Sequence, residues 1–292
     1  MPATLERILT DEQIEQFHND EFLVVRGLFS IKETAMLRDH FMAVHAAGPV
    51  ENSFHPMPLE ETGGDILKHY PRIMQPHRWD ELSKQMLLDA RVGSILRDLF
   101  GETPLAAQSM LYFKPPGARG QALHQDNFYL HVKPGTCLAS WLALDDADEE
   151  NGTLFAVPGS DKLGVLCPHP ADMSKSFTTE EVDIPEGSQP LPINLKAGDV
   201  LFFNGSVIHG SYPNSSRDRF RRAFICHYVG NSTTEMSSGY YPLLNFDGEE
   251  LRRSDAEGGG PCGTEELLAL EQVRQSEREK GGAGVLQGAI AA

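Results

Sequence analysis

The sequence is poor in cysteine, and it contains no long apolar run. Its 292 residues include only four cysteines, Cys137, Cys167, Cys226 and Cys262, and none of them forms a C-x-x-C pair. That density is far below the density of a disulfide-stapled scaffold. No apolar stretch approaches the roughly 20 residues that a membrane-spanning helix needs. The first residues lack the basic and apolar regions of a signal peptide, so we expect a cytoplasmic protein without a membrane partner.

Basic residues are also scarce relative to acidic ones. The chain has 25 Lys and Arg against 42 Asp and Glu, which gives a formal net charge of −17. Nucleic acids and anionic membranes both require clustered Lys and Arg, so neither is an expected partner. The 40% hydrophobic and 23% charged content is ordinary for a globular protein. The length is sufficient to bury a substantial core in one domain.

Capping signals and apolar periodicity predict helices in the first third of the chain. Thr10 and Gln13 match a capping box, so a short helix is expected to begin there. Ser30 precedes a second segment with apolar residues on one helical face. Leucines, isoleucine and valine at helical spacing predict a further helix over residues 79–100.

Strand signals dominate the rest of the chain. Short apolar runs with Gly and Pro corners predict strands over residues 106–155 and again over residues 195–229. Between them, residues 161–192 are rich in Pro, Ser, Thr and acidic side chains. An insertion of this length in a compact barrel is expected to be a functional lid or a disordered loop.

The residues with the clearest chemistry are the triplet His124-Gln125-Asp126 and the later His209. Side chains two positions apart on a β-strand point to the same face, so His124 and Asp126 can direct an imidazole nitrogen and a carboxylate at one point. A lone triplet of this kind is more often a solvated polar turn. With His209 as a third ligand, however, the set matches the two-His, one-carboxylate triad of non-haem Fe(II) oxygenases.

Several motifs surround these residues in a fixed order. They are the HQD triplet, the ASWLALDD strand at 139–146, the ENGTL and VPGS segments within 150–160, and the AGDVLFF run that continues to IHGS at 197–211. Over roughly residues 10–246 the chain resembles the phytanoyl-CoA dioxygenase family of Fe(II)/2-oxoglutarate-dependent oxygenases. The resemblance implies a mainly β fold, a double-stranded β-helix (a jelly-roll, cupin-like barrel) with flanking α-helices.

We expect a single oxygenase domain over residues 1–292. Its core would cover about residues 10–246, with residues 161–192 as a lid-like insertion. Residues 247–292 would follow as a C-terminal extension. In it, Thr264 to Lys280 have the charge pattern of a helix, and the Gly/Ala-rich end is expected to be mobile.

The resemblance also implies the cofactors and their ligands. The metal would be Fe(II), held by His124, Asp126 and His209, with 2-oxoglutarate as co-substrate and O2 as the oxidant. In the family an arginine some eleven residues after the distal histidine binds the far carboxylate of 2-oxoglutarate. Arginine suits this role because it pairs with carboxylates in a bidentate manner, which lysine cannot do.

Three arginines are candidates for that position. Alignment on the A-x-x-C-H stretch selects Arg221, which lies twelve residues after the distal histidine. Arg219 and Arg222 are the alternatives. On a strand, Arg219 would share the face of Arg221, and Arg222 should face away.

Four further side chains are expected near the co-substrate. Ser211 lies two residues after His209, and its hydroxyl could bond to the same carboxylate. Trp141 aligns with a family tryptophan near the cofactor, although a role in the barrel core stays open. Gln108 resembles the 2-oxoglutarate-contacting glutamine of the ectoine hydroxylase branch, and Tyr112 would share its strand face. The other histidines, including His131 and His227 in predicted strands, are expected to be structural.

The predicted function is oxidative decarboxylation of 2-oxoglutarate coupled to hydroxylation, or a related C–H oxidation, of a small molecule. Family halogenases carry a small residue at the carboxylate position, so the presence of Asp126 argues against halogenation. Two alternatives stay open: a cupin-type isomerase or hydrolase, and a metal-binding sensor or scaffold without turnover. No basic cluster suited to a CoA phosphate lies near the motifs, which disfavours a CoA thioester. The sequence defines neither the substrate nor the oligomeric state.

Overall fold

The computed structural model of the chain describes residues 7–256. The predicted charged helix from Thr264 to Lys280 and the tail after it lie outside these residues.

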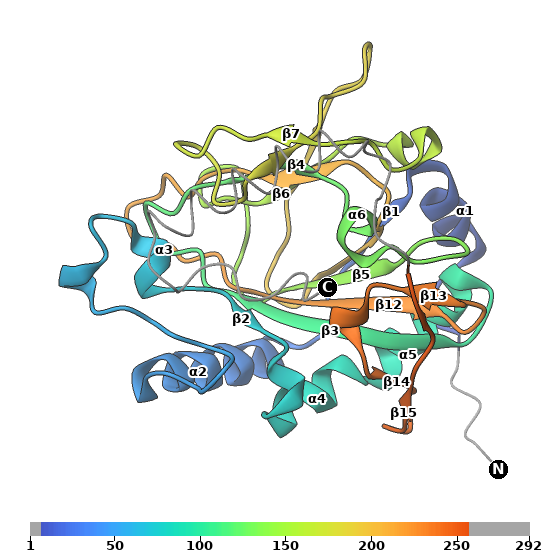
Figure 1. The fold of residues 1–292 in the computed structure, drawn as a ribbon, viewed down its shortest axis with the longest axis horizontal. Helices are drawn as coiled ribbons and strands as arrows, with labels where there is room; N and C mark the ends of the chain where they lie inside the picture. The colour runs from blue at the N-terminus through green and yellow to red at the C-terminus, as the bar shows by residue number, and fades with distance from the viewer. Residues whose placement is uncertain (1–6, 257–292) are drawn as a thin grey trace.

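Two antiparallel sheets face each other and form the body of the molecule (Figure 1). Within residues 7–256, eight strands build the larger sheet. In spatial order they are β1 (Phe22–Val25), β10 (Val200–Asn204), β5 (Leu138–Ala143), β12 (Ala223–Gly230), β3 (Pro104–Tyr112), β14 (Leu243–Leu244) and β15 (Glu250–Leu251), with β2 (Ile73–Met74) also paired to β3. This architecture is the predicted double-stranded β-helix.

The smaller sheet contains four strands of the described residues. Their order is β4 (Gln121–His124), β11 (His209–Ser211), β6 (Leu154–Ala156) and β9 (Leu191–Ile193). Two short ladders lie outside both sheets: β7 (His169–Pro170) with β8 (Glu180–Glu181), and β13 (Glu235–Met236) with β16 (Ser254–Asp255).

Helices cover the outer face of the larger sheet, as the lower half of Figure 1 shows. The α-helices are α1 (Asp11–Asp20), α2 (Ile31–Ala47), α3 (Ile66–His69), α4 (Glu81–Leu87), α5 (Ala90–Phe100) and α6 (Asn127–Leu130). The 3-10 helices are η1 (Leu59–Glu61), η2 (Pro76–Arg78), η3 (Ser160–Leu163) and η4 (Ser238–Tyr240). Among the described residues, no helix has the length and apolarity that crossing a bilayer requires.

Alternation along the strands divides the core into two layers. In β10, Phe202 packs with the helices, whereas Leu201 and Phe203 face the interior between the sheets. In β5, Leu142 and Trp141 divide in the same way. Because successive strand side chains point to opposite faces, each of these strands contributes residues to both layers. The inner layer lines a cavity between the two sheets, which also contains buried polar side chains.

The predicted helix starts at Thr10 and Ser30 are confirmed. The Thr10 hydroxyl accepts a hydrogen bond from the backbone N–H of Gln13, and the Gln13 side chain accepts one from the backbone N–H of Thr10. Ser30 and Glu33 form the same reciprocal pair at α2. Each capping box satisfies backbone donors that the first helical turn leaves unpaired.

The single helix predicted over residues 79–100 is wrong in its extent. The structure has two helices, α4 and α5, with a break at Leu88 and Asp89. The Asp89 carboxylate accepts a hydrogen bond from the backbone N–H of Arg91 and caps a new helix there. Apolar spacing alone did not reveal the break, because the predicted core positions before and after it are buried against the same sheet.

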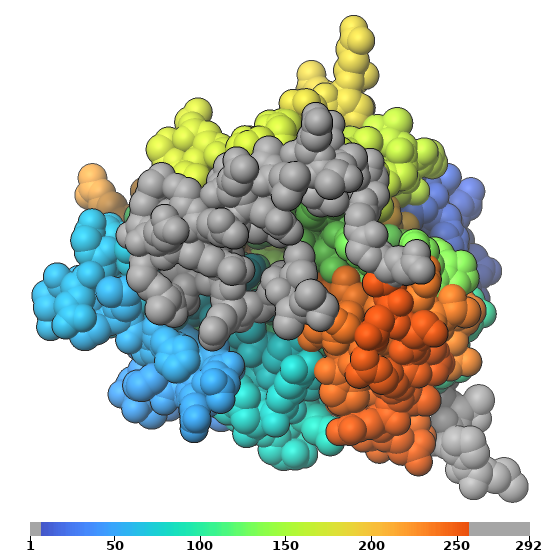
Figure 2. Space-filling model, in the orientation of Figure 1, coloured from blue at the N-terminus to red at the C-terminus, as the bar shows by residue number. Residues whose placement is uncertain are grey.

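The insertion at 161–192 is attached to the smaller sheet. The backbone N–H groups of Phe177 and Val182 donate to the carbonyls of Gly120 and Leu123, at 3.0 and 2.9 Å. In Figure 2 the insertion lies along the upper side of the molecule, in yellow-green to yellow. The insertion therefore extends the smaller sheet beyond β4.

Replacement of Phe41 by alanine should strongly destabilise the fold. Phe41 on α2 is fully buried and stacks on Phe224 of β12 at 5.9 Å between ring centroids. Losing a buried phenylalanine commonly costs about 3–5 kcal/mol. The free energy of unfolding in urea measures the loss. Ile31→Ala, at a side chain that is 67% exposed on the same helix, should change it by less than about 0.5 kcal/mol.

Candidate metal centre

Strand pairing brings the two predicted ligand histidines together. His124 is the last residue of β4, and His209 is the first residue of β11. The two strands are antiparallel neighbours, and His209 lies opposite His124 in their register. The two imidazole centroids are 4.2 Å apart.

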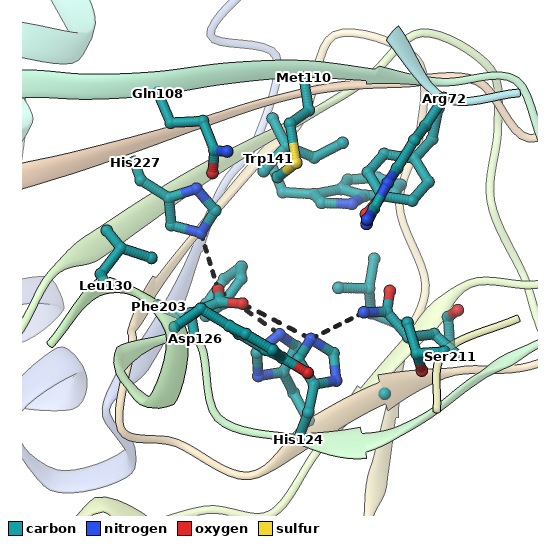
Figure 3. A pocket seen from close by; sticks show the side chains of 18 of the residues that line it. Arg72, Gln108, Met110, His124, Asp126, Leu130, Trp141, Phe203, Ser211 and His227 are labelled. Atoms are coloured by element: carbon teal, nitrogen blue, oxygen red, sulfur yellow. Dashed lines mark hydrogen bonds and ion pairs between the residues drawn. The ribbon is translucent and has the colours of Figure 1, made fainter. Parts of the chain in front are cut away.

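Asp126 joins the histidines, but not by the predicted strand geometry. β4 ends at His124, and Asp126 has helical dihedrals, φ −62 and ψ −34, at the start of α6. The expectation that both side chains leave the same strand face was therefore wrong. The turn from strand to helix instead directs the carboxylate back toward the two imidazoles (Figure 3).

The three side chains converge as predicted. Asp126 Oδ1 is 3.5 Å from His124 Nε2, and Asp126 Oδ2 is 3.7 Å from His209 Nε2. One ligand atom from each of the three residues lies within 4.8 Å of the others, and all three residues are buried. Two imidazoles and one carboxylate are the donor set that suits a non-haem Fe(II) centre.

Backbone contacts fix the orientation of each imidazole. Nδ1 of His124 lies 2.9 Å from the carbonyl of Ala122, and Nδ1 of His209 lies 2.9 Å from the carbonyl of Val207. A carbonyl can only accept, so each Nδ1 carries the proton and each Nε2 presents a lone pair to the centre. Burial, followed by the nearby His124, lowers the pKa of His209 to about 4. His209 is therefore a neutral ligand at physiological pH.

Asp126 supplies the negative charge of the centre. Burial would raise the pKa of its carboxyl, but His227 and His209 outweigh burial and hold it well below its usual range. The ligand set thus contains two neutral nitrogens and one anion, and these residues fit a divalent iron. The side-chain amide of Gln121, which sequence analysis did not consider, lies 3.0 Å from His124 Nε2.

His227 is a site residue that sequence analysis assigned to the structural histidines. It lies in the middle of β12, is buried, and has its Nε2 2.8 Å from Asp126 Oδ2. Its Nδ1 has no hydrogen-bond partner among residues 7–256. The signal that could have revealed it is strand alternation, because Ile225 two positions earlier also faces the interior. His131, also predicted in a strand, instead ends α6.

Arg221 lies in the same cavity as the metal ligands. It is only 3% exposed, its Nε donates to the carbonyl of Gly152 at 2.9 Å, and its guanidinium lies over the ring of Trp141 at 5.1 Å. Burial lowers the pKa of Arg221 to about 10, so the group is still a cation at neutral pH. No carboxylate of residues 7–256 forms an ion pair with it.

The two alternative arginines are already paired at other positions. Arg219 binds Asp148 through two nitrogens, at 2.8 and 2.9 Å, and also binds Glu150. Arg222 binds Asp145 at 2.7 and 2.9 Å. β12 begins only at Ala223, so the strand-face argument did not apply to these residues. Of the three arginines, Arg221 is the one whose charge is not already paired with a carboxylate of residues 7–256.

The other predicted residues line the same cavity. Ser211, Trp141, Gln108 and Tyr112 all contribute to its wall, together with the three metal ligands. Arg72, immediately before β2, also points into it (Figure 3) and donates to the Tyr112 hydroxyl at 3.0 Å. Sequence analysis did not single out Arg72. Residues of the insertion complete one side: Thr178, Thr179 and Glu180.

Comparison with known proteins gives a consistent result. The sequence model of the family described as Phytanoyl-CoA dioxygenase (PhyH) matches residues 17–223. A relative, Phytanoyl-CoA dioxygenase 1 of Oryza sativa subsp. japonica, is 30% identical over 263 residues, which cover 78% of this chain and 92% of the relative.

Solved structures share the fold at lower identity. EctD from S. alaskensis, with 2-oxoglutarate and 5-hydroxyectoine, superposes with a TM-score of 0.62 at 22% identity, covering 79% of each chain. The epimerase SnoN, in complex with Fe3+, alpha ketoglutarate and nogalamycin RO, superposes with a TM-score of 0.60 at 18% identity, covering 85% of this chain and 95% of SnoN.

Replacement of His227 by leucine should weaken metal binding. The variant removes the hydrogen bond that holds one oxygen of the Asp126 carboxylate, and loss of such a partner commonly lowers metal affinity about 10- to 100-fold. Competition with a chelator for Mn(II) measures the change. His227→Gln keeps an N–H donor and should lose less. His169→Leu, at an exposed histidine of β7, is the matched control and should bind like the original chain. Unchanged affinity in His227→Leu would contradict the assigned contact.

Proposed function

The chain belongs to the phytanoyl-CoA dioxygenase (PhyH) family of Fe/2-oxoglutarate-dependent enzymes, and from this we propose that it oxidises a C–H bond of a small molecule. The reaction is hydroxylation, or a related oxidation, with 2-oxoglutarate as co-substrate. One oxygen atom of O2 enters succinate, with release of CO2. The other enters the product in a hydroxylation, or leaves as water with the two hydrogens that a related oxidation removes. The observation that carries the proposal is a buried arginine without a carboxylate partner among residues 7–256, in the cavity that also holds a complete triad.

The metal belongs at His124, Asp126 and His209. Iron bound there supplies the activation of O2 and the oxidation of the keto acid, as the cofactors in the related structures suggest. These three residues would hold the metal and would leave coordination positions for exogenous ligands. His227 holds the Asp126 carboxylate in place, which would fix the orientation of the anionic ligand.

The co-substrate belongs between the triad and Arg221. The guanidinium can pair with the distal carboxylate of 2-oxoglutarate through two N–H groups, because within residues 7–256 only its Nε is hydrogen-bonded, to the Gly152 carbonyl. The Trp141 ring supports the plane of the guanidinium. Ser211, two residues after a metal ligand, adds a hydroxyl to the same carboxylate, while Gln108 and Tyr112 belong to the adjoining wall.

The remaining cavity wall is suited to a small molecule with both apolar and polar parts. Apolar side chains from both sheets, including Met110 and Phe203 of the larger and Leu154 of the smaller, face the space beside the triad. Arg72 and the insertion contribute polar groups at the wall. The substrate would bind there, with its reacting C–H bond directed at the metal.

The alternatives account less well for this arrangement. A cupin-type isomerase or hydrolase has no need of a keto acid, and a silent metal-binding scaffold has no need of a buried carboxylate receptor. Both leave the desolvated charge of Arg221 without a role, although burying an unpaired cation is costly. Asp126 also occupies the position that a halide would need, which disfavours halogenation.

The direct test is conversion of 2-oxoglutarate to succinate by the iron-loaded protein, followed by mass spectrometry. Succinate should form slowly without substrate and faster with small molecules that fit the cavity. Full iron occupancy with no 2-oxoglutarate binding and no succinate would overturn the proposal in favour of a non-oxygenase metalloprotein.

Arg221→Ala should lose the co-substrate and keep the metal. Removing a hydrogen-bonded partner of a buried charge commonly costs about 2–5 kcal/mol, so the apparent constant for 2-oxoglutarate should rise at least about 30-fold. Mn(II) affinity should stay near that of the original chain. Arg219→Ala is the matched control, because its partners are Asp148 and Glu150 rather than the cavity. If Arg219→Ala raised the constant and Arg221→Ala did not, the assignment would be wrong.

Asp126→Gly should abolish oxidation without creating a halogenase. The variant removes the single anion of the ligand set, so iron affinity falls, and the two imidazoles no longer define the geometry. Chloride incorporation is not expected, because the vacancy alone neither holds a halide nor directs a substrate radical to it. Succinate, iron content and product masses in chloride buffer report the outcome. Near-original oxidation with full iron occupancy would show that Asp126 is not a ligand.

A further inference from the structure

A buried lysine lies behind the cavity wall. Lys114 follows β3, is 3% exposed, and donates from its Nζ to the Ser211 hydroxyl oxygen at 2.8 Å. It does not line the cavity itself. Ser211 does, so the serine stands between the ammonium and the space assigned to the co-substrate.

No carboxylate of residues 7–256 lies within ion-pair distance of Lys114. The charged group that faces it is Arg221, whose positive charge adds to burial in lowering the pKa of Lys114 well below its ordinary value. The other groups around it are the Ser211 hydroxyl and the backbone near Gly152 and Tyr212, which do not titrate in this range. Two neighbouring buried cations without a counterion are costly unless an anion arrives.

The backbone at Lys114 is strained, and its side chain packs closely on Gly152. Its φ is 37°, in the left-handed region that favours glycine and is strained for most other residues. Its stem passes over Gly152, where an added Cβ would lie 2.6 Å from the Lys114 Cε. The carbonyl of the same glycine accepts from Arg221 Nε. Gly152 therefore contacts both basic side chains. Its lack of a side chain leaves room for the Lys114 stem, and its carbonyl accepts the hydrogen bond from Arg221.

We propose that Lys114 is a positioning residue of the co-substrate site, which orients the Ser211 hydroxyl toward the distal carboxylate of 2-oxoglutarate. The inference rests on the proposed function. A protonated lysine has three N–H donors and no acceptor. When Lys114 donates to the Ser211 oxygen, the hydroxyl proton of Ser211 cannot point toward the lysine. The proton therefore points toward the cavity. Lysine thus acts through serine rather than by touching the carboxylate.

Co-substrate binding is then linked to protonation of Lys114. A neutral lysine amine can accept the Ser211 proton, which leaves the hydroxyl oxygen facing an incoming carboxylate. The ammonium form instead donates to the Ser211 oxygen, and its positive charge attracts the incoming carboxylate. Binding of the 2-oxoglutarate dianion therefore raises the pKa of Lys114 and draws a proton from solution. Because protonation is linked to binding, 2-oxoglutarate affinity is highest below the Lys114 pKa of the free protein and falls as the pH rises from that pKa to the higher pKa of the complex.

Calorimetry of 2-oxoglutarate binding to the Mn(II)-loaded protein tests this without turnover. Titrations in buffers of different ionisation enthalpy count the protons taken up, and repetition across pH gives the affinity profile. The original chain should take up a proton at pH values between the Lys114 pKa of the free protein and that of the complex. It should bind 2-oxoglutarate more weakly as the pH rises across this range. Lys114→Met should take up none and bind about 10- to 100-fold more weakly at neutral pH. Lys196→Met is the control, since Lys196 pairs with Asp146 at the surface.

A double-mutant cycle separates positioning from a general effect on the fold. If Lys114 acts through Ser211, Lys114→Met should cost little further affinity in a Ser211→Ala background. Thermal unfolding of each variant shows whether it is folded. The number of protons taken up by the original chain is measured without any substitution, so it does not depend on how the variants fold.

Three results would overturn the assignment. They are binding by Lys114→Met within twofold of the original chain, proton uptake that persists in this variant, and additive losses in the double variant. All three leave the proposed function standing. Failure of the original Mn(II) protein to bind 2-oxoglutarate would instead remove the proposed function and this inference together.

Discussion

The pairing of β4 with β11 is the constraint on which the site depends. His124 and His209 are 85 residues apart in the chain, and antiparallel register alone sets them opposite each other. A slip of one residue would turn one imidazole to the other face of the sheet. The register is secured because β11 also pairs with β6 on its other edge, with Gly210 opposite Phe155. The metal centre is thus held by backbone hydrogen bonds on both sides of one short strand.

The metal end and the carboxylate end of the proposed co-substrate site carry groups of opposite kind. The carboxylate of Asp126 lies at the histidine cluster, whereas the basic side chains of Arg221 and Lys114 meet at Gly152. A dianion with a chelating end and a carboxylate end matches this polarity, and a neutral ligand of the same size does not. The low dielectric of the interior strengthens such matching, since each charge is removed from water. The positive charge of Arg221 is in place before the co-substrate arrives, because its pKa stays at about 10.

Much of this arrangement was predictable from the sequence. Motif order identified the triad, and the β-helix followed from the same resemblance. Local backbone changes were not predictable: the strand stops at His124, so Asp126 reaches the centre from a helix start, and Asp89 begins a new helix within a continuous apolar pattern. His227 was missed because its partner is 101 positions away, and no spacing rule connects them. Arg221 was selected by alignment, but the reason it is available lies in the partners of its two neighbours, which only tertiary structure reveals.

The attachment of the insertion has a consequence for how this enzyme can diversify. Thr178, Thr179 and Glu180 form part of the cavity wall, and Phe177 and Val182 beside them bond to the segment ending in His124 through backbone groups. Backbone bonds are indifferent to side-chain identity. Residues 178–180 can therefore be exchanged while the scaffold beneath them stays in register, and the centre keeps its ligands. The residues that form the metal centre are thus distinct from the cavity wall at 178–180, which makes this wall a natural starting point for engineering the shape of the cavity.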